Sequence, residues 1–209
     1  MCRDIFNFYL MPHLPTIKTT PLPPDSPFHS SGQLLDFSIV DFWGWSQSDL
    51  VENRNRGILA EFLVMKALGI QRPTRLEWDE VDFVTEDNIK VEVKSAAYIQ
   101  AWEQNDYSSI SFDIAHKSRL LPNGDFSKEK FRIADIYIFC LLHHKDQATI
   151  NPMSLDQWTF YVVPTKVLEE KLKEQKTLGL STLIYLGFTG LSYEKLRDQF
   201  LMILESEHR

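Results

Sequence analysis

The sequence contains one segment, DIYIFCLL at residues 135–142, in which nearly every residue is apolar. A strand with one face in water alternates apolar and polar residues, so a continuous apolar run indicates a strand that is buried on both faces. A doubly buried strand needs a layer of structure on each side. The segment therefore predicts an α/β chain with a mixed central β-sheet flanked by α-helices.

Periodicity in the rest of the chain supplies the other elements of this expected sheet. We expect further strands at residues 109–114 and 159–163, and helices at residues 165–175 and 192–205. In the last helix the apolar residues follow helical spacing and should pack on the sheet. These residues are Leu196, Phe200, Ile203 and Leu204.

Residues 81–95, VDFVTEDNIKVEVKS, have the pattern of a β-hairpin. Apolar residues alternate with Lys90, Glu92 and Lys94, which places these three charged side chains on one face of a strand. The preceding residues 85–88, TEDN, favour a tight turn. Folding back at this turn brings Asp82 beside Glu92.

Two carboxylates at this distance repel each other unless a cation lies between them. Oxygen ligands of this kind suit Mg²⁺ or Mn²⁺ rather than Zn²⁺. The hairpin thus predicts a divalent metal site at Asp82 and Glu92. An alternative is that the polar face is simply solvated, as in any half-exposed antiparallel strand.

Glu61 is the single carboxylate in the apolar run ILAEFLVM at residues 58–65. We expect a helix from near Ser46 to Leu68, with Glu61 at least partly buried in it. Burial of an unpaired carboxylate destabilises the fold by on the order of a few kcal/mol, unless the carboxylate is bound to a metal. The alternatives to a metal are an ion pair with Arg54 or Arg56, or a raised pKa.

The order of a helical Glu, a strand Asp and a Glu-x-Lys triplet resembles the PD-(D/E)xK phosphodiesterase superfamily. The resemblance implies a restriction-endonuclease-like core, with a Mg²⁺ or Mn²⁺ ion bound by Asp82, Glu92 and the backbone carbonyl of Val93. It implies that Lys94 orients or helps to deprotonate the attacking water and stabilises charge on the phosphate. Glu61 would support the metal from the helix.

The resemblance covers residues 46–142 and departs from the family pattern at one position. Val81 stands where the name of the superfamily implies a Pro, and this leaves Asp79 as a rival metal ligand. We favour Asp82, because Phe83 and Val84 follow it and place it on the strand. Asp79 lies nearer the preceding loop.

Residues 95–102, SAAYIQAW, are compatible with a continued strand or with a new helix that begins at Ser95. Both leave Gln100 near the site, where it is a candidate substrate-binding residue. If the strand continues, Tyr98 and Trp102 form an aromatic ridge on which unpaired bases can stack. The alternative is that these two aromatic residues pack in the core.

Composition limits the domain organisation and the cellular location. A chain of 209 residues with 44% apolar content predicts one domain, at residues 31–209. We expect residues 1–30 to form an extended arm. Either Met1 or Met11 can be the native start. No apolar run is long enough to span a bilayer, and the N-terminus lacks a signal peptide. Cys2 and Cys140 have no metal or disulfide spacing. These features predict a cytoplasmic protein.

A net charge of −7 argues against a protein that coats duplex nucleic acid through bulk electrostatics. Local basic groups remain compatible with a nuclease, and residues 117–132 are a candidate phosphate clamp. An alternative is a solvated loop around the turn at residues 122–125. The basic residues are Lys117, Arg119, Lys128, Lys130 and Arg132, and we assign no role to His116, His143 or His144.

These features together predict a Mg²⁺-dependent phosphodiesterase that acts on DNA, as an endonuclease of restriction or repair type. The alternative is a catalytically inactive domain that keeps the nuclease fold and binds nucleic acid or a partner protein. The sequence leaves open whether the substrate is DNA or RNA, whether it is single- or double-stranded, which sequence is cut, and whether the protein forms a homodimer.

Overall fold

A four-stranded mixed sheet forms the centre of the protein, in a computed structural model that describes residues 17–76, 80–120 and 126–207. Its order is β3-β4-β8-β9, in which β4 runs parallel to β8 and the other neighbouring pairs are antiparallel. All seven residues of β8 are buried, which confirms the central strand. The strands are β3 (Phe83–Val84), β4 (Lys90–Ala97), β8 (Ile136–Leu142) and β9 (Trp158–Pro164).

Each face of this sheet carries its own apolar core. Helices α2 (Asn53–Leu68) and α5 (Leu196–Glu207) cover one face, where Leu196 and Phe200 are buried and Ile203 and Leu204 pack against them as predicted. The predicted α/β class with a flanked mixed sheet is confirmed. The other face is covered by β5 (Ser111–Asp113), α3 (Thr165–Leu172), β10 (Thr177–Gly179) and α4 (Leu180–Tyr185).

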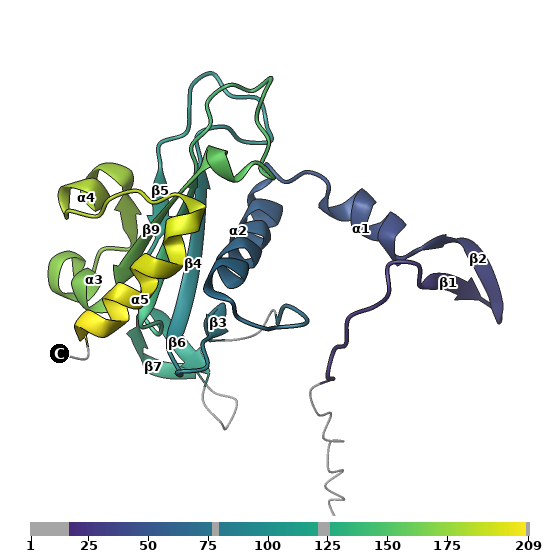
Figure 1. The fold of residues 1–209 in the computed structure, drawn as a ribbon, viewed down its shortest axis with the longest axis horizontal. Helices are drawn as coiled ribbons and strands as arrows, with labels where there is room; N and C mark the ends of the chain where they lie inside the picture. Colours follow the sequence, from purple (N-terminus) through teal and green to yellow (C-terminus); the bar gives the residue numbers. More distant parts are fainter. Residues whose placement is uncertain (1–16, 77–79, 121–125, 208–209) are drawn as a thin grey trace, which may run out of the picture.

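The N-terminal segment forms local structure that extends away from the sheet (Figure 1). Strands β1 (Pro27–Ser30) and β2 (Gln33–Ser38) pair as a hairpin, and α1 (Ile39–Gln47) follows without a buried residue. The predicted arm at residues 1–30 thus ends in a strand that sequence periodicity did not indicate, and its residues 1–16 lie outside the described part. None of the described helices is both long and apolar enough to cross a membrane.

Helix α2 begins later than predicted. Ser46, the expected start, belongs to α1, and α2 begins at Asn53, where the side chain of Glu52 accepts hydrogen bonds from the N–H groups of Arg54 and Asn55. A carboxylate at this position satisfies two free donors of the first turn. The predicted end is confirmed, because Gly69 adopts a φ of 75° and closes the helix.

The predicted basic loop is largely a second hairpin, formed by β6 (Lys117–Leu120) and β7 (Phe126–Phe131). Arg132 does not belong to a phosphate clamp, because its side chain is fully buried. Its guanidinium donates to the carbonyl oxygens of Ile114 (2.7 Å), Lys173 (2.6 Å) and Gln175 (2.9 Å) and pairs with Glu169 (2.9 Å). Arg132 therefore ties β5 to the end of α3. The remaining short elements are the 3₁₀ turns Leu155–Gln157 and Tyr193–Lys195.

Replacement of Arg132 with Met should lower the free energy of unfolding by about 3–5 kcal/mol, because the buried Ile114 carbonyl, the two partly buried bonds to the Lys173 and Gln175 carbonyls and the Glu169 ion pair all lose their partner. Chemical denaturation of the purified variant measures this change. Lys130→Met is the matched control, since Lys130 is exposed on β7, and should change stability by less than about 0.5 kcal/mol. Equal denaturation midpoints for Arg132→Met and the unaltered protein would contradict the assigned structural role.

Candidate active site

One pocket of about 370 Å³ brings together the four predicted catalytic side chains, Glu61, Asp82, Glu92 and Lys94. They come from the middle of α2, from the residue before β3 and from β4. With all groups ionised, four carboxylates and three cations line the pocket, so that its lining has a net negative charge. The other lining residues are Asn53, Gly57, Arg75, Glu80, Val81, Val93, Ser95 and Lys117.

The hairpin has the predicted register and turn. Phe83 pairs with Val91 and Val84 with Lys90, and Asn88 adopts a φ of 62° in the turn. Strand β3 begins only at Phe83, opposite Val91, so no described strand pairs with this side of β4 from Glu92 onward. The side chain of Asp82 takes the place of a strand, since its Oδ2 accepts a hydrogen bond of 2.6 Å from the N–H of Val93.

The backbone of Val93 faces the pocket. In a strand, the N–H and C=O groups of one residue point to the same side, because paired residues exchange both bonds. The Val93 N–H points to Asp82, so its carbonyl points to the same open edge of β4. This orientation is the one that the predicted metal ligand at Val93 needs.

Glu92 is 4% exposed, and two lysines offset its charge. Its Oε1 lies 2.6 Å from Lys94 Nζ and 2.7 Å from Lys117 Nζ. Burial by itself lowers the pKa of Lys94, but the nearby charges of Glu92 and Asp82 outweigh it and raise that pKa overall. Lys117 was expected only in a basic loop, and sequence spacing gave no sign that β6 brings it to Glu92.

Asp82 is the carboxylate with the least compensation in the pocket. Burial, followed by repulsion from Glu92 and Glu61, raises its pKa from 3.8 to about 7, although the Val93 N–H and Lys94 act in the opposite direction. The pocket therefore disfavours the charged form of Asp82 in the absence of a further cation.

Glu61 is partly buried, as expected, but its partner was not predicted. Arg75 binds it through two bonds, Nε to Oε2 at 2.6 Å and Nη2 to Oε1 at 2.9 Å. Neither Arg54 nor Arg56 is the compensating cation. Arg75 lies in the connection between α2 and β3, outside any periodic segment.

Gln100 does not line this pocket. Strand β4 continues to Ala97, after which the chain bends, so neither the continued strand nor the new helix is correct through residue 102. Gln100 is buried, where its amide donates to the carbonyl of Ala97 (2.8 Å) and accepts from Arg56 Nη1 (3.3 Å). Its position is that of a structural link beside the pocket, and its substrate-binding role stays a prediction.

The remaining candidates lie away from the pocket or outside the described residues. Lys128 and Lys130 are exposed on β7, the side chain of Arg119 is outside the described part, and so is the rival ligand Asp79. The histidines have local partners. His116 contacts Glu169 (3.1 Å), His143 contacts Thr159 (2.8 Å) and His144 contacts Thr149 (2.8 Å).

The donors in the pocket fit a hard divalent cation. Within residues 17–76, 80–120 and 126–207, no three His, Cys, Asp or Glu side chains are grouped so that they alone could hold a metal. The predicted set instead has two carboxylates and one carbonyl, all oxygen donors, and Mg²⁺ commonly keeps several waters beside one or two carboxylates. The net negative lining and the raised pKa of Asp82 both favour an added cation.

Asp82→Asn should stabilise the metal-free protein at alkaline pH. Because the folded state raises the pKa of Asp82 from 3.8 to about 7, the folded state holds this proton more tightly than the unfolded state does. This contribution is present in full below about pH 4 and is lost as pH rises through about 7. The variant should match the unaltered protein in acid and exceed its Tm by several degrees at pH 8, in thermal melts with EDTA.

Asp36→Asn serves as the control, since Asp36 is an exposed carboxylate on β2. Its Tm difference from the unaltered protein should not grow with pH. A Tm difference for Asp82→Asn that is flat across this pH range would contradict the burial of an uncompensated carboxylate.

Two sequence comparisons relate the chain to known proteins. A comparison with curated proteins gave no match. Residues 41–182, more than half of the chain, match the family of bacteriophage T4 endonuclease IV, and the matched range contains every residue of the pocket. The chain belongs to the bacteriophage T4 endonuclease IV family.

Proposed function

We propose that the protein is a divalent-metal-dependent endonuclease that hydrolyses phosphodiester bonds in DNA. The observation that carries the proposal is the convergence of Glu61, Asp82, Glu92 and Lys94 in one pocket of a chain from an endonuclease family. The combination of mixed sheet, open β4 edge and Glu-x-Lys triplet supports placing the chain in the PD-(D/E)xK superfamily. A restriction or repair type of endonuclease is the corresponding biological role.

In this proposal Asp82, Glu92 and the carbonyl of Val93 hold Mg²⁺ or Mn²⁺. The bound ion supplies a water of lowered pKa and neutralises charge on the phosphate. Asp82 has two tasks, because the same carboxylate also fixes the strand edge through Val93 N–H at 2.6 Å. Its hydrogen bond therefore sets the separation of the ligands before substrate arrives.

Lys94 and Lys117 are the two groups that interact with the phosphate in this proposal. Lys94 is held 2.6 Å from Glu92, which positions its ammonium to orient the attacking water and to stabilise negative charge on the phosphate. Lys117 is 45% exposed and lies on the solvent side of Glu92, where it can contact a phosphate that enters from solution. Glu61, held by Arg75, keeps negative charge on the α2 side of the pocket.

A single active site of this kind would hydrolyse one DNA strand at a time. Cleavage of both strands of a duplex would need a second copy of the chain or a second encounter, and a homodimer is part of this proposal only if duplex DNA is the substrate. The alternative function, a binding module without activity, predicts nucleic-acid binding without cutting.

Lys94→Ala should abolish cleavage in a panel of linear, circular, single-stranded and branched DNA and RNA, incubated with Mg²⁺ or Mn²⁺. Loss of a charge that stabilises the transition state should lower kcat at least about a hundredfold. Lys128→Ala, which removes an exposed lysine from β7, is the control and should cut normally. Equal cutting by Lys94→Ala and the unaltered protein would reject the role of Lys94, and no cutting of any substrate would favour the binding module.

Mn²⁺ binding provides a test that does not depend on activity. Water proton relaxation should detect one tight Mn²⁺ site in the unaltered protein and in Lys94→Ala. Asp82→Asn should weaken that site at least about tenfold, because it removes one charged oxygen ligand. Unchanged Mn²⁺ affinity in Asp82→Asn would show that the metal ligands lie elsewhere.

A further inference from the structure

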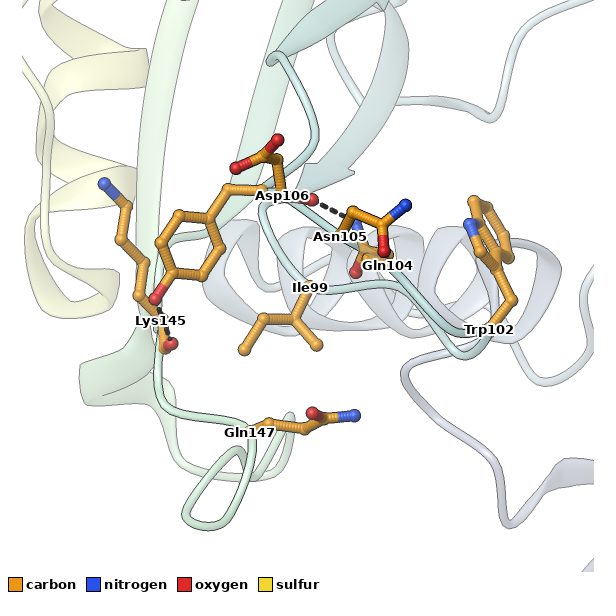
Figure 2. A pocket seen from close by; sticks show the side chains of 8 residues that line it. Ile99, Trp102, Gln104, Asn105, Asp106, Lys145 and Gln147 are labelled. Atoms are coloured by element: carbon orange, nitrogen blue, oxygen red, sulfur yellow. Dashed lines mark hydrogen bonds between the residues drawn. The ribbon is translucent and has the colours of Figure 1, made fainter.

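A second pocket, of about 380 Å³, lies beyond the end of β4 (Figure 2). The segment after β4 and the segment after β8 form its walls, and the proposed reaction uses none of its residues. Figure 2 shows Ile99 in the middle, between Lys145 on one side and Trp102 on the other. Its volume is in the range of small-ligand sites. The lining includes Ile99, Trp102, Asn105, Tyr107, Lys145 and Gln147.

Hydrogen bonds hold the two walls in place without a ligand. The amide of Gln104 accepts from the N–H of Gln100 (2.6 Å) and donates to Ser108 Oγ (3.0 Å), which fixes the loop after β4. The hydroxyl of Tyr107 donates to the carbonyl of Lys145 (2.9 Å) and joins this loop to the second wall. The pocket is therefore formed before binding, which reduces the entropy lost when a ligand enters.

The lining chemistry matches a flat, uncharged, polar ligand. Trp102 is 59% exposed and offers aromatic surface for stacking, whereas the ring of Tyr107 already has Lys145 Nζ 5.4 Å from its centroid. The side-chain amides of Asn105 and Gln147 have no hydrogen-bond partner among the described residues and offer donors and acceptors. Lys145 and Asp106 are the two charged residues of the lining, and their charges balance. A base fits this lining better than a phosphate does.

A chain of hydrogen bonds connects this pocket to the catalytic one. Asn53 lines the catalytic pocket and accepts from Arg56 Nη2 (2.5 Å), while Arg56 Nη1 donates to Gln100 Oε1 (3.3 Å). Gln100 in turn donates its N–H to Gln104 in the wall of the second pocket. The strand from Lys94 to Ala97 spans only about 10 Å, at about 3.3 Å per residue. A nucleic-acid strand that crosses the catalytic pocket can thus reach the second pocket within a few nucleotides.

We propose that the second pocket seats one unpaired base of the substrate strand, a few nucleotides from the bond that is cut. In this arrangement Trp102 stacks on the base, and Asn105 and Gln147 contact its edge. A paired base has both faces stacked and its edge occupied, so it cannot enter a concave pocket without leaving the duplex. This inference rests on the proposed function for the identity of the ligand as a DNA strand.

The test is equilibrium binding of a labelled single-stranded DNA of about ten nucleotides, followed by fluorescence anisotropy in EDTA, where the proposed cleavage is off. Trp102→Ala and Asn105→Ala are the variants, and both positions are exposed, so the fold should be retained. Trp45→Ala is the matched control, because Trp45 is 85% exposed on α1 and lies outside the pocket. A series of strands with one abasic position each locates the seated base.

Trp102→Ala should weaken binding about tenfold, as expected for the loss of one stacked base, and Trp45→Ala should not. One abasic position should weaken binding by the unaltered protein to a similar degree and should cause no further loss in Trp102→Ala. Equal affinities of Trp102→Ala and the unaltered protein, additive losses, or no binding of the strand would overturn the proposal. If the unaltered protein cleaves DNA and Trp102→Ala binds the strand with unchanged affinity, the proposed endonuclease function stands and the base site is rejected. If binding depends on Trp102 but the unaltered protein does not cleave, the base site stands and the endonuclease function is rejected.

Discussion

The short length of β3, which begins only at Phe83, is the constraint on which the catalytic pocket depends. Two residues of β3 pair with β4, and the edge of β4 is then free at Glu92. An open strand edge exposes donors and acceptors that need partners. The carboxylate of Asp82 takes one donor, the Val93 N–H, and leaves the Val93 carbonyl facing the pocket. The interaction that ends the pairing of two strands also gathers the oxygen atoms of the site.

The cost of grouping carboxylates is offset by cations from three different segments. Arg75 comes from the connection after α2, Lys94 from β4 itself and Lys117 from β6. Each cation pairs with Glu61 or Glu92, and Asp82 has no comparable partner at ion-pair distance among the described residues. The deficit at Asp82 marks the position at which an added divalent charge would have its largest effect.

Local patterns predicted the parts of the fold that depend on neighbouring residues. The alternation around Glu92, the turn before it and the Gly69 helix end were all correct, because each depends on a few adjacent residues. Ion pairs between distant segments were missed. Arg75 lies 14 residues from Glu61 and Lys117 lies 25 residues from Glu92, and no periodicity reports such a pairing. Arg132 was misassigned for the same reason, since composition cannot distinguish a buried arginine from an exposed one.

Arg56 links the loop after β4 to the start of α2, and so connects the two pockets. Its side chain is 2% exposed, its Nε has no hydrogen-bond partner among the described residues, and its two terminal nitrogens reach Asn53 and Gln100. A buried guanidinium held at both ends behaves as a rigid spacer. Insertions or altered loop lengths between residues 98 and 107 would therefore transmit mechanical strain to the start of α2. Such a change would reach the catalytic pocket through Asn53, although no residue of the loop lines that pocket.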